Sequence, residues 1–128
     1  MATRVESNLV QDVSSMKISA VMRHVRVSPT KVRRLADLVR GKTIAEGLLC
    51  LRFLPHRGAR MMEKAIQSAK ANADDLGVRV PQEFLIRVAS VDSGPTLKRM
   101  QPHARGMGFE IKKRTSHITV VIESQTDN

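Results

Sequence analysis

Aromatic residues are nearly absent from this sequence, which has no Trp, no Tyr and three Phe. Proteins that bind single-stranded nucleic acid without sequence preference use aromatic side chains on which successive bases stack. Such platforms are largely unavailable here. If the partner is a nucleic acid, we expect recognition through its backbone and folded shape.

Cysteine and long apolar runs are also scarce. Cys50 is the single cysteine, so an internal disulfide is excluded, and a reducing, cytoplasmic setting is expected. No apolar run approaches the ~20 residues of a membrane-spanning helix. The N-terminal residues include Glu6 and Asp12 and lack the apolar core of a signal peptide. We therefore expect no membrane partner and no secretion.

Acidic residues are outnumbered, because 12 Asp and Glu stand against 22 Lys and Arg, a formal net charge of +10 with a pI near 10.9. This excess predicts a polyanionic partner rather than a small-molecule substrate. A length of 128 residues is most simply one domain with one modest core.

No residue pattern indicates catalysis or a metal site. His24, His56, His103 and His117 are far apart and lack partners at metal-ligand spacing. Ser116 and His117 are adjacent and would face opposite sides of a strand, which makes them a poor nucleophile and base pair. We expect no enzyme activity, no metal and no cofactor.

The body begins with a strand over 17–27, where Val21, Arg23, Val25 and Val27 recur at a period of two. Ser28-Pro29 is a typical helix start, and Gly41 a typical stop. The intervening helix has an apolar stripe and an opposite basic face. The stripe is Val32, Leu35, Ala36 and Val39; the basic face is Lys31, Arg33, Arg34 and Arg40, interrupted by Asp37.

Two further helices follow. Thr43 and Glu46 have the spacing of a capping box that begins a short helix, which ends by Pro55. The longer third helix runs from about His56 to Leu76, and Gly77 ends it. The expected buried residues of the second helix are Ile44, Leu48, Leu51 and the small hydrophobe Cys50; those of the third are Ala59, Met62, Ile66, Ala69, Ala73 and Leu76.

Two more strands enclose a long arm. Phe84, Ile86 and Val88 alternate before it, and Ile118, Val120 and Ile122 alternate after it. The predicted fold is α+β, with a small sheet of about three strands packed on three helices and a long protruding β-hairpin that leaves one edge of the sheet. The predicted divisions are a flexible extension over 1–16, one α+β domain over 17–123 that includes the hairpin at about 91–113, and a short tail over 124–128.

The arm is strongly basic and cannot form a core. Its middle, over 94–114, holds Lys98, Arg99, Arg105, Lys112, Lys113 and Arg114 against the single acid Glu110, with Pro and Gly between them. An isolated two-stranded ribbon is marginal in water, so a polyanionic partner is expected to hold it. The basic face of the first helix, taken alone, is more often simply solvated. A DNA-architectural protein with a basic β-arm that bends duplex DNA is the alternative from another class.

Four stretches resemble the bacterial large-subunit ribosomal protein twenty-two family. They are SPTKVRRLADLVRGK over 28–42, SAKANA over 68–73, GPTLKRMQPHARG over 94–106 and KRTSHITVV over 113–121. The likeness covers about 17–123 in the order and spacing of the family. The chain differs at His103 and over 107–110, where more basic residues are expected, so fewer phosphate contacts are predicted on that strand.

The resemblance implies a body seated on large-subunit ribosomal RNA near the outer mouth of the peptide exit tunnel. It also implies a hairpin that lines the tunnel wall, a role in early subunit assembly, and neighbours that include other large-subunit proteins and the nascent polypeptide. No catalysis and no cofactor are implied. The predicted RNA-binding residues are Lys31, Arg33, Arg34, Arg40, Lys42, Lys98, Arg99, His103, Arg105, Lys112, Lys113, Arg114, Thr115, Ser116 and His117; the predicted tunnel-facing tip is Leu97, Lys98, Arg99, Met100, Gln101, Pro102, His103, Ala104, Arg105 and Gly106.

Overall fold

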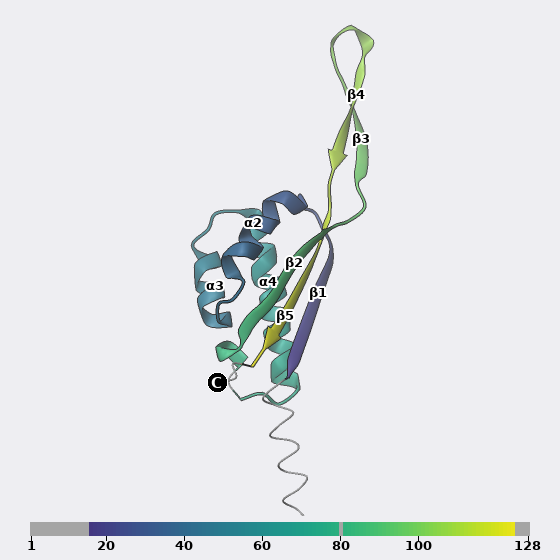
Figure 1. Ribbon diagram of the computed structural model, residues 1–128. Coiled ribbons are helices and arrows are strands. Elements are labelled where there is room, and N and C mark those ends of the chain that lie inside the picture. Colours follow the sequence, from purple (N-terminus) through teal and green to yellow (C-terminus); the bar gives the residue numbers. More distant parts are fainter. Residues whose placement is uncertain (1–15, 80, 125–128) are drawn as a thin grey trace, which may run out of the picture.

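A computed structural model describes residues 16–79 and 81–124 and confirms the predicted α+β class (Figure 1). Within these residues, three helices and a three-stranded sheet make up the body, and a separate two-stranded ribbon leaves it. In chain order the elements are β1 (Lys17–Val25), α2 (Pro29–Val39), α3 (Ile44–Arg52), α4 (Arg57–Asp75), β2 (Leu85–Ser93), β3 (Leu97–Pro102), β4 (Gly108–Lys113) and β5 (Ser116–Glu123), with short 3-10 turns at Pro81–Glu83 and Ala104–Gly106.

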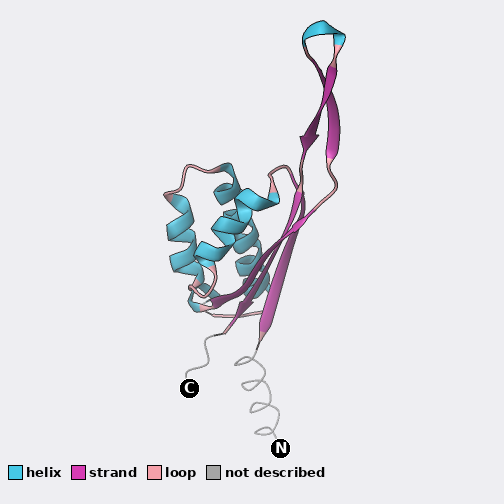
Figure 2. Cartoon of the chain, turned by 45° about the horizontal axis from the view of Figure 1, so that its top comes forward, coloured by secondary structure: helices cyan, strands magenta, loops and turns pink. Residues whose placement is uncertain are grey.

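The sheet is antiparallel, in the order β1-β5-β2, so the last strand in the chain is the central one. Helices α2 and α4 pack against one face of it, and α3 packs on α4 (Figures 1 and 2). The alternation predicted for β5 is confirmed, because Ile118, Val120 and Ile122 are all fully buried in the core beneath these helices.

In both outer strands a β-bulge switches which alternate residues face the core. Two residues in the predicted apolar alternation, Val21 and Val88, are therefore exposed. In β1 the buried residues are Ile18 and Ala20, while Val21 is 52% exposed. The register shifts between Met22 and Val25, and this shift returns Val25 to the core. A bulge adds one residue to a strand and so reverses the faces of the residues beyond it.

The same event occurs in β2. Its register against β5 shifts between Ile86 and Val88. Ile86 is buried and Val88 is 42% exposed, and burial resumes at Ala89 and Val91. The predicted alternation holds up to Ile86, and beyond it the inward residues are those of the opposite phase.

The predicted apolar stripe of α2 is confirmed, since Val32, Leu35, Ala36 and Val39 are all buried. Two predictions on the other helices were wrong. Leu76 lies just beyond the last turn of α4 and is 60% exposed. Cys50 is half-buried rather than buried, and its sulfur lies 3.4 Å from Nζ of Lys42.

Arg60 holds the corner between α3 and α4. Its guanidinium donates to the carbonyl oxygens of Leu51, Arg52 and Leu54 at 3.3, 2.9 and 2.6 Å and pairs with Glu63 at 2.8 Å. The last carbonyls of a helix lack intrahelical partners, so a cation placed here stabilises the C-terminus of α3. The corner in turn fixes where α4 begins and thereby the position of Arg57, its first residue.

The arm is formed by β3 and β4 and projects from one end of the sheet, well clear of the helices (Figures 1 and 2). It continues from the C-terminal end of the edge strand β2 and returns into the central strand β5. The prediction that it leaves an edge of the sheet is thus corrected: it leaves an end, where two strands finish together. At about 3.4 Å per residue, its six-residue strands extend about 20 Å before the tip.

Within the described residues, no helix is both long and apolar enough to cross a membrane. The extension predicted over 1–16 and the tail predicted over 124–128 lie, apart from Met16 and Ser124, outside the described residues.

The core assignment predicts the effect of truncating Ile66, which is fully buried on α4. Ile66→Ala should lower the free energy of unfolding by about 2–5 kcal/mol, since a large-to-small core change loses transfer energy and leaves a cavity. Chemical denaturation measures this. The matched control Lys98→Ala, exposed on the arm, should change it by less than about 0.5 kcal/mol. Equal losses in the two variants would contradict the assigned core.

Candidate nucleic-acid interface

The register of the arm sorts its side chains onto two faces. Residues directly opposite in an antiparallel pair share a face, as do alternate residues along a strand. Lys98 is opposite Lys112, and Met100 is opposite Glu110, so these four share one face. Like charges placed opposite each other are destabilising. Glu110 offsets this only in part, through a long contact of 3.8 Å between its Oε1 and Nζ of Lys98.

The second face of the arm carries cations without an acid. Leu97 is opposite Lys113, Arg99 opposite Ile111 and Gln101 opposite Phe109. Arg99 and Lys113 are exposed. Positive charge therefore lies on both faces of the ribbon, which is the distribution expected of an arm surrounded by a polyanion rather than laid on a flat surface.

The tip is a tight reversal whose side chains all face solvent. The amide of His103 donates to the carbonyl oxygen of Met107 at 2.7 Å. Arg105 and Gly106 adopt the left-handed conformation, with φ of 63° and 72°. The turn thus places the Arg105 side chain at the far end of the arm, where residues 101–110 are all exposed.

The arm is fastened to the body by close packing at Gly94. The Gly94 amide donates to the carbonyl oxygen of Thr115 at 2.9 Å, and Thr115 Oγ1 donates to the carbonyl oxygen of Pro95 at 2.6 Å. A Cβ at position 94 would lie 2.5 Å from Thr115 Oγ1 and 3.2 Å from the ring of His117. Thr115 and Ser116 are buried, so we remove these two predicted RNA-binding residues from the interface and assign them to the arm root.

His117 also binds within the protein. Its Nδ1 accepts from the backbone amide of His24 at 3.1 Å, and the two rings meet edge to face with centroids 4.9 Å apart. His24 has a φ of 57° at the bulge of β1. The His117 side chain therefore ties the end of β1 to the arm root, and only part of it remains exposed.

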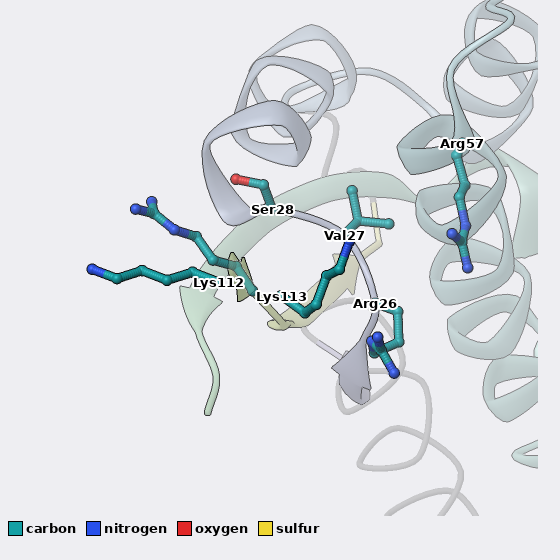
Figure 3. A pocket seen from close by; sticks show the side chains of 7 residues that line it. Arg26, Val27, Ser28, Arg57, Lys112 and Lys113 are labelled. Carbon is teal, nitrogen blue, oxygen red and sulfur yellow. The ribbon is translucent and has the colours of Figure 1, made fainter. Parts of the chain in front are cut away.

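A hollow lined mostly by cations lies beside the arm root (Figure 3). It has a volume of about 550 Å³ and is lined by Arg26, Val27, Ser28, Arg57, Lys112, Lys113 and Arg114. Arg26 and Arg57 extend on one side of the turn at Val27 and Ser28, and Lys112 extends on the other (Figure 3). The cations surround this turn, as is suited to a phosphate backbone that passes across it.

A second hollow of about 720 Å³ adjoins the first and shares Arg26 and Arg57 with it. Its lining adds Lys31 and Arg34, two of the predicted residues on α2. We call the two together the basic hollow. Among the described residues, seven Arg and Lys line it and no Asp or Glu does: Arg26, Lys31, Arg34, Arg57, Lys112, Lys113 and Arg114.

Two helix N-termini also reach the basic hollow. Ser28 precedes α2 and His56 precedes α4, and neither side chain accepts a capping hydrogen bond from a backbone amide of its helix. The N-terminal amides and the helix dipole favour an anion at both positions. Arg57 occupies the first turn of α4, where a cation is unfavourable unless an anion lies nearby. The helix geometry and the side chains thus favour the same ligand.

Three predicted RNA-binding residues are used elsewhere or lie apart from the arm. Arg33 Nε donates to Val91 O at 3.2 Å, and Arg40 donates to Ala89 O at 2.6 Å. Both cover the open edge of β2, whose main-chain groups would otherwise lack partners. Lys42 lies at the other end of β2, because its carbonyl oxygen accepts from the amide of Ile86.

Sequence reasoning missed Arg26 and Arg57. Arg26 was placed at the end of a predicted strand, and nothing in the local pattern indicated that it would meet the arm root, 86 residues later at Lys112. Arg57 carried a usable signal, since a cation in the first turn of a helix opposes the helix dipole.

Among the described residues, no group of three or more His, Cys, Asp or Glu side chains is placed to hold a metal ion.

The sequence from 20 to 123 matches the family described as Ribosomal protein L22p/L17e. The chain belongs to this family. Three curated proteins named "Large ribosomal subunit protein uL22" are similar to it. The protein of Herpetosiphon aurantiacus is 48% identical over 108 residues, 84% of this chain and 96% of the relative. That of a Roseiflexus species is 45% identical over the same shares, and that of Desulfosudis oleivorans is 49% identical over 106 residues, 83% of this chain and 92% of the relative.

Family membership confirms the resemblance inferred from the four sequence stretches. Members are ribosomal proteins, a structural and non-enzymatic class, and this agrees with the expectation that the chain is not an enzyme. The positions of Arg26 and Arg57, and the basic hollow that they form with the arm, come from the geometry of this chain alone.

The packing at the arm root predicts that Gly94→Ala misplaces the arm. Its Cβ would meet Thr115 Oγ1 at 2.5 Å, so the variant should lose about 1–3 kcal/mol of unfolding free energy. Backbone amide chemical shifts should change over 94–97 and 113–117 and remain unchanged in α4. The matched control is Gly108→Ala on the arm, whose Cβ would meet only the flexible end of Met100 at 3.1 Å. An undisturbed root in the Gly94 variant would contradict the packing described.

Proposed function

We propose that this chain is a structural constituent of the large ribosomal subunit, in the cytoplasm, and that it binds large-subunit ribosomal RNA. Its family and the printed names of its relatives support the first part. One observation above all supports the second: in the part of the chain that the structure describes, the basic hollow is lined by seven Arg and Lys of the body and the arm and by no acidic residue.

The mechanism is neutralisation of phosphates at positions fixed by the fold. Each Arg or Lys that contacts a phosphate releases condensed counterions, which gives affinity without reading sequence. Specificity for folded RNA then comes from the shape of the basic surface, since cations just after β1, on α2, on α4 and on the arm must all find phosphates at once. The residues proposed to bind RNA are Arg26, Lys31, Arg34, Arg57, Lys98, Arg99, His103, Arg105, Lys112, Lys113 and Arg114.

The arm is proposed to enter the RNA and to line the peptide exit tunnel with its tip at 97–106, where it meets the nascent polypeptide. Support comes from its projection without any helix beside it (Figure 1) and from the exposure of every side chain over 101–110. A ribbon of two strands needs a partner for stability. Folded RNA around the arm is proposed to supply one. The family resemblance further suggests that the chain assists early assembly of the subunit.

Salt dependence tests the RNA interface. Six to ten phosphate contacts should make the affinity for transcribed large-subunit RNA fall about 10³–10⁵-fold between 50 and 200 mM salt. The double variant Arg26→Gln, Arg57→Gln should reduce the logarithmic salt slope by about 2, about one for each lost contact. Filter binding across a salt series measures both quantities.

The matched control for this test is Lys64→Gln with Arg79→Gln, since both residues are exposed and lie outside the lining of the basic hollow. This variant makes the same change in net charge and should leave the slope near that of the unaltered chain. A nearly flat salt response, or equal effects of the two double variants, would count against the interface.

Changes at the base and at the tip of the arm are expected to affect different functions. Replacing Lys112, Lys113 and Arg114 by Gln removes charge from the basic hollow, so RNA association should weaken and assembly of the large subunit should slow. Replacing residues 101–109 by Asn-Gly keeps the pair of Met100 and Glu110 and closes the hairpin with a two-residue turn. This shorter arm should allow assembly and change how small molecules bind in the tunnel.

Subunit sedimentation profiles and tunnel-ligand binding, measured on both arm variants, decide between these roles. The assignment of assembly to the base and of the tunnel wall to the tip is wrong if the shortened arm alone blocks assembly while tunnel-ligand binding stays unchanged. Binding of the chain to bent duplex DNA in preference to ribosomal RNA would favour the architectural alternative instead.

A further inference from the structure

One face of the arm brings together an aromatic ring, an amide and a cation. The strand register places Phe109 directly opposite Gln101, and Arg99 lies two residues further along the same strand. Opposite and alternate positions share a face, so these three side chains are neighbours. His103 lies on the same face, because its ring meets that of Phe109 edge to face with centroids 4.7 Å apart.

Phe109 differs in its surroundings from the other two phenylalanines. Phe84 is buried in the core, and Phe53 follows α3 and is 79% exposed on the body. Phe109 is 54% exposed on a strand whose pairing fixes its backbone, and the His103 ring restricts its side chain further. An aromatic ring held in this way loses little conformational entropy when a second ring system stacks on it.

The charges around this face select the ligand. Arg99 lies on the face and Arg105 at the adjoining tip, whereas Glu110 lies on the other face and contacts Lys98. Apolar peptide surfaces gain little from such cations, while RNA presents a phosphate within one nucleotide of every base. Unpaired bases of folded RNA stack on aromatic side chains and use their edges for hydrogen bonds. The face therefore suits one nucleotide rather than a stretch of polypeptide.

We propose that Phe109 stacks against one unpaired base of RNA, with Gln101 bonding the edge of the base and Arg99 contacting a neighbouring phosphate. The site rests on the proposed RNA-binding function and makes it more specific. A Gln amide matches the adjacent donor and acceptor of adenine, so adenine is the expected base. The arm thereby reads one base, whereas the basic hollow binds only backbone.

The near absence of aromatic residues makes the site directly observable. We would titrate the full chain with hexa-adenylate RNA and with an abasic hexamer that carries the same number of phosphates, and follow the phenylalanine ring protons by NMR. Stacking shifts the Phe109 signals through the ring current of the base, and only hexa-adenylate should cause this. Phe53 is the internal control, since it is more exposed but lies outside the arm.

Two variants test the contribution to affinity. Phe109→Leu keeps an apolar side chain and removes the stacking ring, so affinity for hexa-adenylate should fall on the order of tenfold while that for the abasic RNA stays unchanged. Phe109→Trp keeps a stacking platform and should retain both affinities. Gln101→Leu should retain stacking and reduce the preference for hexa-adenylate over hexa-uridylate.

Each other outcome overturns the site in a recognisable way. Equal affinities for hexa-adenylate and the abasic RNA would reject base stacking while leaving the phosphate interface standing. Shifts of Phe53 as large as those of Phe109 would show indiscriminate stacking and would also reject it. A shift of Phe109 with an apolar hexapeptide and with neither RNA would assign the face to polypeptide. Failure of both RNAs to bind at low salt would count against the proposed RNA interface as a whole.

Discussion

The antiparallel ladder between β2 and β5 is the contact on which both halves of the molecule depend. Within the body it buries Ile86, Ala89 and Val91 against the central strand. Beyond the body the same two chain segments continue as the arm, and the direction of the ladder becomes the direction of the arm (Figure 1). Gly94 and Thr115 form the joint, and their close packing transmits the orientation of the sheet to the basic ribbon.

Positive charge and apolar burial are kept apart in this fold. One hydrophobic core lies between the sheet and helices α2 and α4. Burial of its apolar side chains is the main free energy that favours folding of the body. The seven cations of the basic hollow repel one another, since no acid among the described residues lines it, and each would be more stable beside an anion. The body is therefore expected to fold alone, whereas the surface around the arm root remains incomplete until a polyanion binds.

Much of the body could be predicted from periodicity alone. The helix stripes and the alternation in β5 were confirmed because each depends on neighbours within the same element. The errors at Val21 and Val88 have one cause, since a β-bulge reverses the faces of a strand and leaves no local composition signal. The burial predicted for Leu76 and Cys50 was wrong because Leu76 lies at the end of its helix and Cys50 at the margin of its apolar stripe. At such positions tertiary packing decides exposure.

The candidate site was predictable in its charge but not in its arrangement. A count of Lys and Arg identified the arm, and α2 supplied Lys31 and Arg34. The burial of Thr115 and the position of Arg26 depend on contacts between distant parts of the chain, which the linear pattern does not contain. The use of Arg33 to cover the open edge of β2 was equally invisible, because it required knowing which strand lay at the edge.

The placement of β5 at the centre of the sheet has a consequence for when the protein can fold. Among the described strands, β1 and β2 each pair along their length with β5, which follows both in the chain; β2 has in addition an isolated bridge between Leu85 and Thr43. During synthesis the helices can form as they emerge, but neither outer strand can join a sheet until β5 arrives. Since long-range pairing must wait for it, the unpaired strands remain open to aggregation throughout elongation. The sheet thus closes in a single late event, after which β5 holds both neighbours at once.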